Sequence, residues 1–142
     1  MQTEMVQGER RRGMKKKLCE CLLDGQPAVV YTQTGESSSA SATWPNAERR
    51  YIEVVIGIDE KWSQVLAAAL HEAFEYTMTE HLQAYENAHS WHFCTAHRLF
   101  VLNHQQFTEA CACTADFLQV ITPPLLKAWK AQDKELRKKK KS

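Results

Sequence analysis

The sequence predicts an α+β protein in which a small, mostly antiparallel sheet packs against two or three helices. Short segments with the two-residue alternation of strands come first in the chain, and long segments with helical periodicity follow. The hydrophobic content of 44% and the charged content of 25% are typical of a globular protein with a hydrophobic core. A length of 142 residues suits one compact domain.

Basic residues gather near both ends of the chain. Three arginines and three lysines lie within residues 10–17, and lysine dominates residues 137–142. We expect residues 1–15 to be a disordered basic leader, residues 16–136 to be the single domain, and residues 137–142 to be a basic tail. Both Met1 and Met14 are candidates for the natural start.

Two strands are expected at residues 16–23 and 28–33. Asp24-Gly25 lies between them, and this dipeptide is typical of a tight hairpin turn. Residues 36–46 are rich in serine and end in Pro-Asn, so we expect a loop there.

The clearest strand is expected at residues 50–58. One of its two faces is purely aliphatic and consists of Ile52, Val54, Ile56 and Ile58. Asp59 is expected to cap the N-terminus of a following helix. Glu60 would then lie in the first turn, where the helix dipole favours a carboxylate.

A helix is expected from residue 60 to about residue 83, because this segment contains no glycine or proline. Apolar side chains cover most of its circumference, which predicts a buried helix. The polar stripe that is left spans about 100°, and it consists of Gln64, His71, Glu72, Glu75 and Thr79. Burying an imidazole and carboxylates is costly unless something pairs with them, and a metal ion would do so.

The rest of the chain predicts an irregular segment and two further helices. Residues 85–95 show no clear period, and residues 97–102 are expected to be a short strand or an extension into the next helix. A second amphipathic helix is expected at residues 104–121. Pro123-Pro124 should break the chain, and a third helix is expected at residues 125–136.

The H-E-x-x-E sequence at residues 71–75 has the chemistry of a metal site and differs at one position from the H-E-x-x-H of zinc peptidases. His71 and Glu75 lie four residues apart, so their side chains share one helix face and can reach the same ion. Glu72 points about 100° away from His71, where it can act as general base on a metal-bound water. His71 and Glu75 are therefore the predicted ligands, and Glu72 is the predicted catalytic residue.

A third protein ligand must come from another part of the chain. His104 is favoured, because it lies on the stripe of the second helix that is expected to face the core. Glu109 is the next candidate, although it points away from that stripe, and His97 follows. His89 and His92 lie in the segment without a clear period and stay open as alternatives.

The order of a strand, an H-E-x-x-E helix and a second amphipathic helix resembles the small zincin-like metallopeptidases common in bacteriophage genomes. Two segments carry the resemblance, RYIEVVIGIDEKWSQVLAAALHEAFEYT and NHQQFTEACACTADFLQVI, and together they span roughly residues 50–121. Some members of that group carry H-E-x-x-E followed by a histidine that opens the next helix. The resemblance implies a zincin-like fold, a bound zinc ion or another divalent metal, and a metallopeptidase-like hydrolase that acts on a peptide or protein.

Composition and charge limit the other classes of function. A net charge of +1 argues against a nucleic-acid partner, and no apolar run is long enough to span a membrane. The chain has no signal-peptide pattern and an odd number of cysteines, so we expect it in the cytoplasm, or in the host cytoplasm if it is phage-encoded. The alternative to a hydrolase is a catalytically inactive metal-binding or protein-interaction module of the same fold. The oligomeric state stays open.

Overall fold

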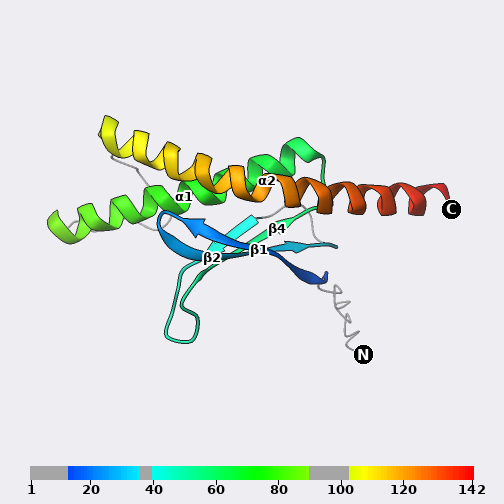
Figure 1. Cartoon of the computed structure of the whole chain (residues 1–142), viewed down its shortest axis with the longest axis horizontal. Helices are drawn as coiled ribbons and strands as arrows, with labels where there is room; N and C mark the ends of the chain where they lie inside the picture. The colour runs from blue at the N-terminus through cyan, green and yellow to red at the C-terminus, as the bar shows by residue number, and fades with distance from the viewer. Residues whose placement is uncertain (1–12, 36–39, 90–102) are drawn as a thin grey trace, which may run out of the picture.

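The described part of the chain folds as four strands followed by two long helices, so the predicted α+β class is confirmed. The computed structural model describes residues 13–35, 40–89 and 103–142, without the side chains of residues 81–89. Both helices lie on the same face of the sheet (Figure 1). α1 (Trp62–His89) packs against β3 and β4, and α2 (His104–Lys141) packs against β1 and β2.

The four strands form one mixed sheet in the order β1-β2-β4-β3. β1 (Lys15–Leu23) and β2 (Gln26–Gln33) are antiparallel, as are β3 (Ala40–Thr43) and β4 (Ile52–Gly57). The central pair, β2 and β4, is parallel. The sheet is therefore mixed at its centre, because the chain first runs to the outer edge as β3 and then returns as β4 beside β2.

The turn between β1 and β2 has the predicted geometry. Asp24 and Gly25 both take positive φ angles, 51° and 72°. A two-residue turn of this kind matches the right-handed twist of the flanking strands, and glycine adopts its angle without strain. The hairpin prediction is confirmed.

The prediction of a loop at residues 36–46 is wrong in part, because β3 lies within it. The strand is only four small residues long, and its local sequence carries little preference for a strand. It is held from two sides instead. Its backbone pairs with β4, and the Ala42 N–H donates to the Glu72 carboxylate on α1, at 3.1 Å.

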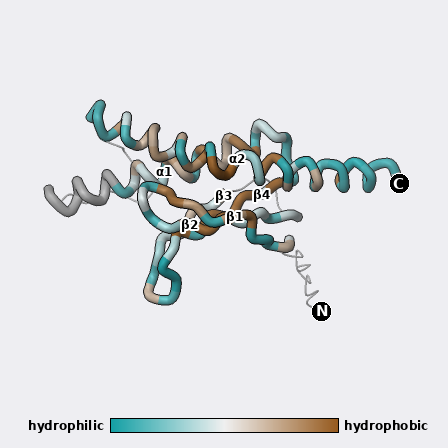
Figure 2. The backbone as a smooth tube through the Cα atoms, viewed as in Figure 1, coloured by the Kyte–Doolittle hydropathy of each residue, from teal (hydrophilic) through white to brown (hydrophobic). Residues whose placement is uncertain are grey.

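The core lies between the sheet and the two helices. The predicted aliphatic face of β4 is confirmed, since Ile52, Val54 and Ile56 are fully buried and Ile58 is buried just after the strand. Among the described side chains, Phe117 of α2 is the largest that is fully buried. Segments of hydrophobic residues lie together where the middle of α2 meets the sheet, whereas the residues of the C-terminal part of α2 are hydrophilic (Figure 2).

α1 begins later and ends later than expected. Asp59 does not cap the N-terminus of α1. Its carboxylate instead accepts hydrogen bonds from the Gly35 N–H, just after β2, and from Gln132 Nε2 of α2. The first helical turn closes on the Lys61 carbonyl. The helix continues to His89, so the first part of the segment expected to be irregular is helical, and residues 90–102 lie outside the description.

The prediction that α1 is buried nearly all round is wrong. Val65, Ala69 and Ala73 are at most 1% exposed, but Leu70 is 48% exposed and His71 is also exposed. The sheet and α2 cover two sides of α1 and leave the remaining side open. The candidate site therefore lies at the surface.

α2 is one continuous helix, so the predicted break at Pro123-Pro124 and the predicted separate third helix are wrong. The prolines deprive the carbonyls of Gln119 and Val120 of their helical donors. Both of these residues have exposed side chains on the solvent side of the helix, where water can replace the lost donors. The expected basic tail at residues 137–142 is likewise helical as far as Lys141. Among the described residues, no helix has a stretch apolar enough to cross a membrane.

Candidate metal centre

His71, Glu72 and Glu75 form a cluster of metal-ligating side chains on the open side of α1. One candidate ligand atom from each lies within 4.8 Å of the other two. The helical spacing brings His71 and Glu75 onto one face, as predicted. Glu72, which the helix directs about 100° away, still places a carboxylate oxygen within reach of both.

The His71–Glu75 pair lies at the solvent boundary. His71 Nε2 is 3.0 Å from Glu75 Oε2, and the two side chains are 67% and 35% exposed. Water therefore solvates the imidazole, and the expected cost of burying it does not arise. The reason for a metal here must be the arrangement of the donors rather than a need to neutralise a buried charge.

Glu72 is a partly buried carboxylate that contacts the sheet. Its Oε2 accepts a hydrogen bond from the Ala42 N–H of β3. Burial raises the pKa of the Glu72 carboxyl above its ordinary value, whereas the Ala42 hydrogen bond and the neighbouring His71 lower it. The net shift is upward, so Glu72 holds a proton at higher pH than a solvated glutamate does.

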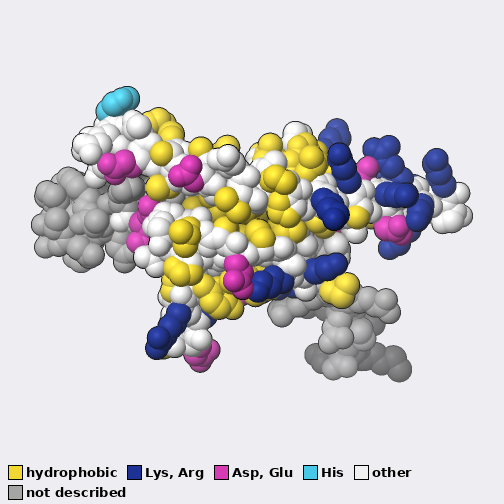
Figure 3. Space-filling model, viewed as in Figure 1, with side chains coloured by type: hydrophobic (Ala, Val, Ile, Leu, Met, Phe, Trp, Pro, Cys, Tyr) yellow, Lys and Arg dark blue, Asp and Glu magenta, His cyan; other side chains and the backbone are white. Residues whose placement is uncertain are grey.

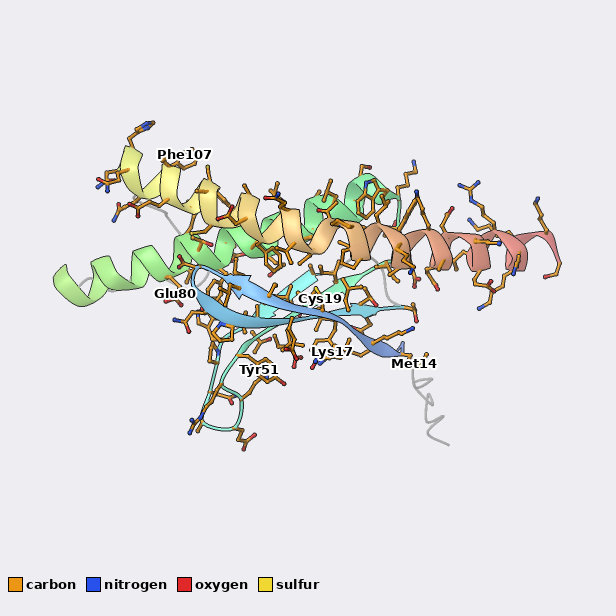
Figure 4. All side chains as sticks on the ribbon, in the orientation of Figure 1. Met14, Lys17, Cys19, Tyr51, Glu80 and Phe107 are labelled. Atoms are coloured by element: carbon orange, nitrogen blue, oxygen red, sulfur yellow. The ribbon has the colours of Figure 1, made fainter. Side chains whose placement is uncertain are left out.

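A pocket of about 300 Å³ lies between β3 and α1, beside this cluster. Trp44 closes one end, because its ring packs against Tyr76 at 5.1 Å and its Nε1 donates to Glu80 Oε1 at 2.6 Å. Glu80 lies on α1 beside one end of the sheet (Figure 4). Burial raises the pKa of Tyr76 to about 12, so its hydroxyl is neutral at physiological pH. The pocket is lined by Ala40, Ser41, Ala42, Trp44, Glu72, Glu75 and Tyr76.

The contributions of Ala42 and Trp44 to the site have no signal in the sequence. Ala42 acts through its backbone N–H, which every residue except proline has, so its identity gives no signal. Trp44 lies in the segment expected to be a loop, 36 residues before its partner Glu80. Only the pairing of β3 with β4 brings both residues to α1.

The structure does not bring His104 to this cluster. Phe74 and Phe107 pack edge-on at 5.8 Å, and Trp62 packs on Trp129 at 5.7 Å, so α1 and α2 run antiparallel. In that register His104 lies about six residues beyond His71 along the helix axis, a separation of about 9 Å. His104 is exposed at the first residue of α2 and is not a member of the group of close ligand atoms.

Among the alternative third ligands, Glu109 does not enter the cluster either. Glu109 is exposed and accepts a hydrogen bond from Gln105 Nε2 on its own helix, at 3.1 Å. His92 and His97 lie outside the described residues, and so does the side chain of His89. The described donors are therefore one imidazole and two carboxylates, all from α1.

Comparison of the chain with protein-family models, with curated proteins and with solved structures found no match. The resemblance of residues 50–121 to zincin-like metallopeptidases therefore stays a prediction.

The raised pKa of Glu72 should make the stability of the folded chain depend on pH. A carboxyl whose pKa is higher in the folded chain stabilises the fold when it is protonated, and this contribution is lost as the pH rises through the folded-state pKa. Glu72→Gln should therefore raise the urea midpoint at pH 7, in chelator, and the gain should vanish at about pH 4, near the ordinary carboxyl pKa. An equal gain at both pH values would contradict this cause.

Proposed function

We propose that this chain is a divalent-metal-dependent hydrolase with a zincin-like arrangement, in which His71 and Glu75 hold the metal and Glu72 is the general base. One observation carries the proposal: three ligand atoms lie within 4.8 Å of one another, and two of their residues, Glu72 and Glu75, line the pocket between β3 and α1. Zinc is the metal that this donor set suits, and other divalent ions share the same preferences.

His71 and Glu75 fit such an ion in type and spacing, and the third protein ligand of a catalytic zinc site is not among the described side chains. Zinc binds nitrogen and oxygen ligands at about 2.0–2.2 Å, so two ligands of one ion lie roughly 3 Å apart or slightly more. The distance of 3.0 Å between His71 Nε2 and Glu75 Oε2 is close to this. A bound ion would supply a water of lowered pKa and would polarise a carbonyl. The exposure of His71 leaves room for water and substrate, as catalytic sites require and closed structural sites do not.

The orientation of Glu72 and the direction of its pKa shift both suit a general base. The hydrogen bond from Ala42 fixes one carboxylate oxygen, which leaves the second oxygen to accept a proton from water. Its pKa is shifted upward, toward the range in which a carboxylate accepts protons effectively. The side chain therefore combines a fixed orientation with increased basicity.

The substrate class we infer is an extended peptide. β3 is one of the two edge strands of the described sheet, and β4 is its strand partner. Extended peptides bind such edges through backbone hydrogen bonds, while pockets select their side chains. The pocket between β3 and α1 lies beside Glu72, and the neutral Tyr76 lines it.

Metal-dependent cleavage is the test of this proposal. The purified chain should hydrolyse casein or a fluorogenic peptide mixture, lose that activity in chelator and regain it when zinc is added. Activity that survives exhaustive chelation, or the absence of cleavage in the zinc-loaded chain, would contradict the proposal.

A second candidate is a module without catalytic activity. The observation that favours it is the hydrogen bond from Ala42 to Glu72, which fastens α1 to the edge of the sheet and gives this carboxylate a structural task. In that case the chain would bind metal through His71 and Glu75 without cleaving peptides. Metal content and peptide cleavage, measured on the same preparation, separate the two candidates.

A further inference from the structure

The second half of α2 carries a one-sided row of basic side chains. Six of them lie within about 100° of the helix circumference when residues are counted at about 100° each. They define the basic stripe: Lys127, Lys130, Lys134, Arg137, Lys138 and Lys141. All six are exposed.

The opposite side of α2 is docked on the body, so the stripe faces away from it. Leu125 is fully buried, and Trp129 Nε1 donates to the Glu60 carbonyl at 2.7 Å. Gln132 Nε2 donates to Asp59 at 2.7 Å. These three side chains point roughly 130–170° away from the centre of the stripe. Lysine and arginine side chains accordingly gather over this end of the molecule (Figure 3).

Little of this charge is neutralised within the chain. Arg137 pairs with Asp133 at 2.7 Å, and Lys138 pairs with Glu135 at 2.9 Å. The other four members of the stripe form no ion pair with any residue that the structure describes. Residues 127–141 hold eight basic and two acidic side chains, whereas the whole chain carries only +1. The near-neutral total therefore conceals a strong separation of charge.

The chemistry of the stripe identifies its partner as a regular polyanion. The stripe is about 21 Å long at 1.5 Å per residue, and a DNA duplex presents about 12 phosphate charges over that length. A membrane-binding helix would place large apolar side chains beside its basic face, but beyond Trp129 the single large apolar residue is Leu136. Single-strand binding surfaces add aromatic rings for base stacking, and the stripe contains none.

We propose that the basic stripe of α2 binds the phosphate backbone of a nucleic-acid duplex. Binding is independent of base sequence, because lysine contacts to phosphate carry no sequence information. Its strength falls steeply with salt. For six contacts, the association constant drops on the order of 10³-fold between 50 and 200 mM salt. The stripe is separate from the His71 cluster, so this inference goes beyond the proposed hydrolase and does not depend on it.

A titration of a labelled 20-base-pair DNA duplex with the full chain tests the proposal. Combined Lys127→Gln, Lys130→Gln and Lys134→Gln should make the slope of log K against log salt shallower by about three, one unit for each phosphate contact. The matched control combines Lys16→Gln, Lys139→Gln and Lys140→Gln, which removes the same charge outside the stripe and should leave the slope nearly unchanged. Circular dichroism checks that both variants keep their helices, and His71→Ala should bind DNA like the wild type.

Three results would overturn the proposal. The wild type could fail to bind the duplex at 50 mM salt. The control could weaken binding as much as the stripe variant, which would mean that net charge alone is responsible. Vesicles of phosphatidylserine and phosphatidylcholine could bind in a stripe-dependent way while the duplex does not, which would assign the stripe to an anionic membrane surface.

Discussion

Glu72→Gln should abolish most peptide hydrolysis and leave the metal in place. The amide keeps the shape of the side chain and can still accept the Ala42 hydrogen bond, but it cannot take a proton from water. Loss of a general base lowers turnover about 10²–10⁴-fold. Zinc content should stay at the wild-type level, because His71 and Glu75 are unchanged.

The matched control for this prediction is Glu60→Gln, which removes one carboxylate just before the start of α1 and far from the cluster. It should retain wild-type activity and metal. Equal activity of Glu72→Gln and the wild type would remove Glu72 as the base and favour the module without catalysis. Loss of metal in Glu72→Gln would show instead that this carboxylate is itself a ligand.

Phe117→Ala should cause the largest loss of stability. The ring is fully buried where α2 meets the sheet, and its removal leaves a cavity that the neighbouring strands cannot fill. Changes of this kind cost about 3–5 kcal/mol in the free energy of unfolding. For a chain of this length the thermal midpoint should fall on the order of 10 °C.

Phe107→Ala provides the comparison, because it makes the same chemical change on the same helix at a site that is 47% exposed. Its ring contacts Phe74 edge-on, and Figure 4 shows it near the start of α2. Its removal should cost about 1 kcal/mol. The free energy of unfolding of both variants is measured by urea denaturation with chelator present. If both lose a similar amount, Phe117 is not at the centre of the core.

The parts of the fold that were predictable depend on local sequence. The alternation of aliphatic residues in β4 and the Asp24-Gly25 turn each act over a few neighbouring residues, and both predictions are confirmed. β3 has no comparable signal, since it exists through its pairing with β4 and its contact with Glu72. The prolines of α2 were misleading, because the buried Ile121 and Leu125 hold the helix together across a break that an isolated peptide would show.

The same distinction applies to the candidate site. His71 and Glu75 are neighbours through helical geometry alone, so their meeting follows from a spacing of four residues. The position of His104 depends on the register of α1 against α2, and that register is fixed by ring contacts such as the one between Phe74 and Phe107. Periodicity places a residue on a face of its helix but does not say how far one helix slides along another. The expected third ligand was therefore placed at the wrong height, and on a face of α2 that is exposed rather than buried.

The charge pattern shows a similar limit of sequence reasoning. A net charge of +1 argued against a nucleic-acid partner, but the sum takes no account of where the charges lie. The continuous α2 collects basic residues on one side of the molecule, and the His71 cluster contributes two carboxylates from the other helix. A chain that is nearly neutral overall thus has a basic surface on α2 and an acidic cluster on α1.

A titration of zinc into the metal-free chain, followed by calorimetry, tests the central claim most directly. We predict about one equivalent bound by the wild type, and affinity lowered at least tenfold in His71→Ala and in Glu75→Gln. His104→Ala, which alters an exposed histidine outside the cluster, should bind as the wild type does. A wild-type chain that takes up no zinc, or a His71→Ala chain that binds it equally well, would contradict the assignment of this site.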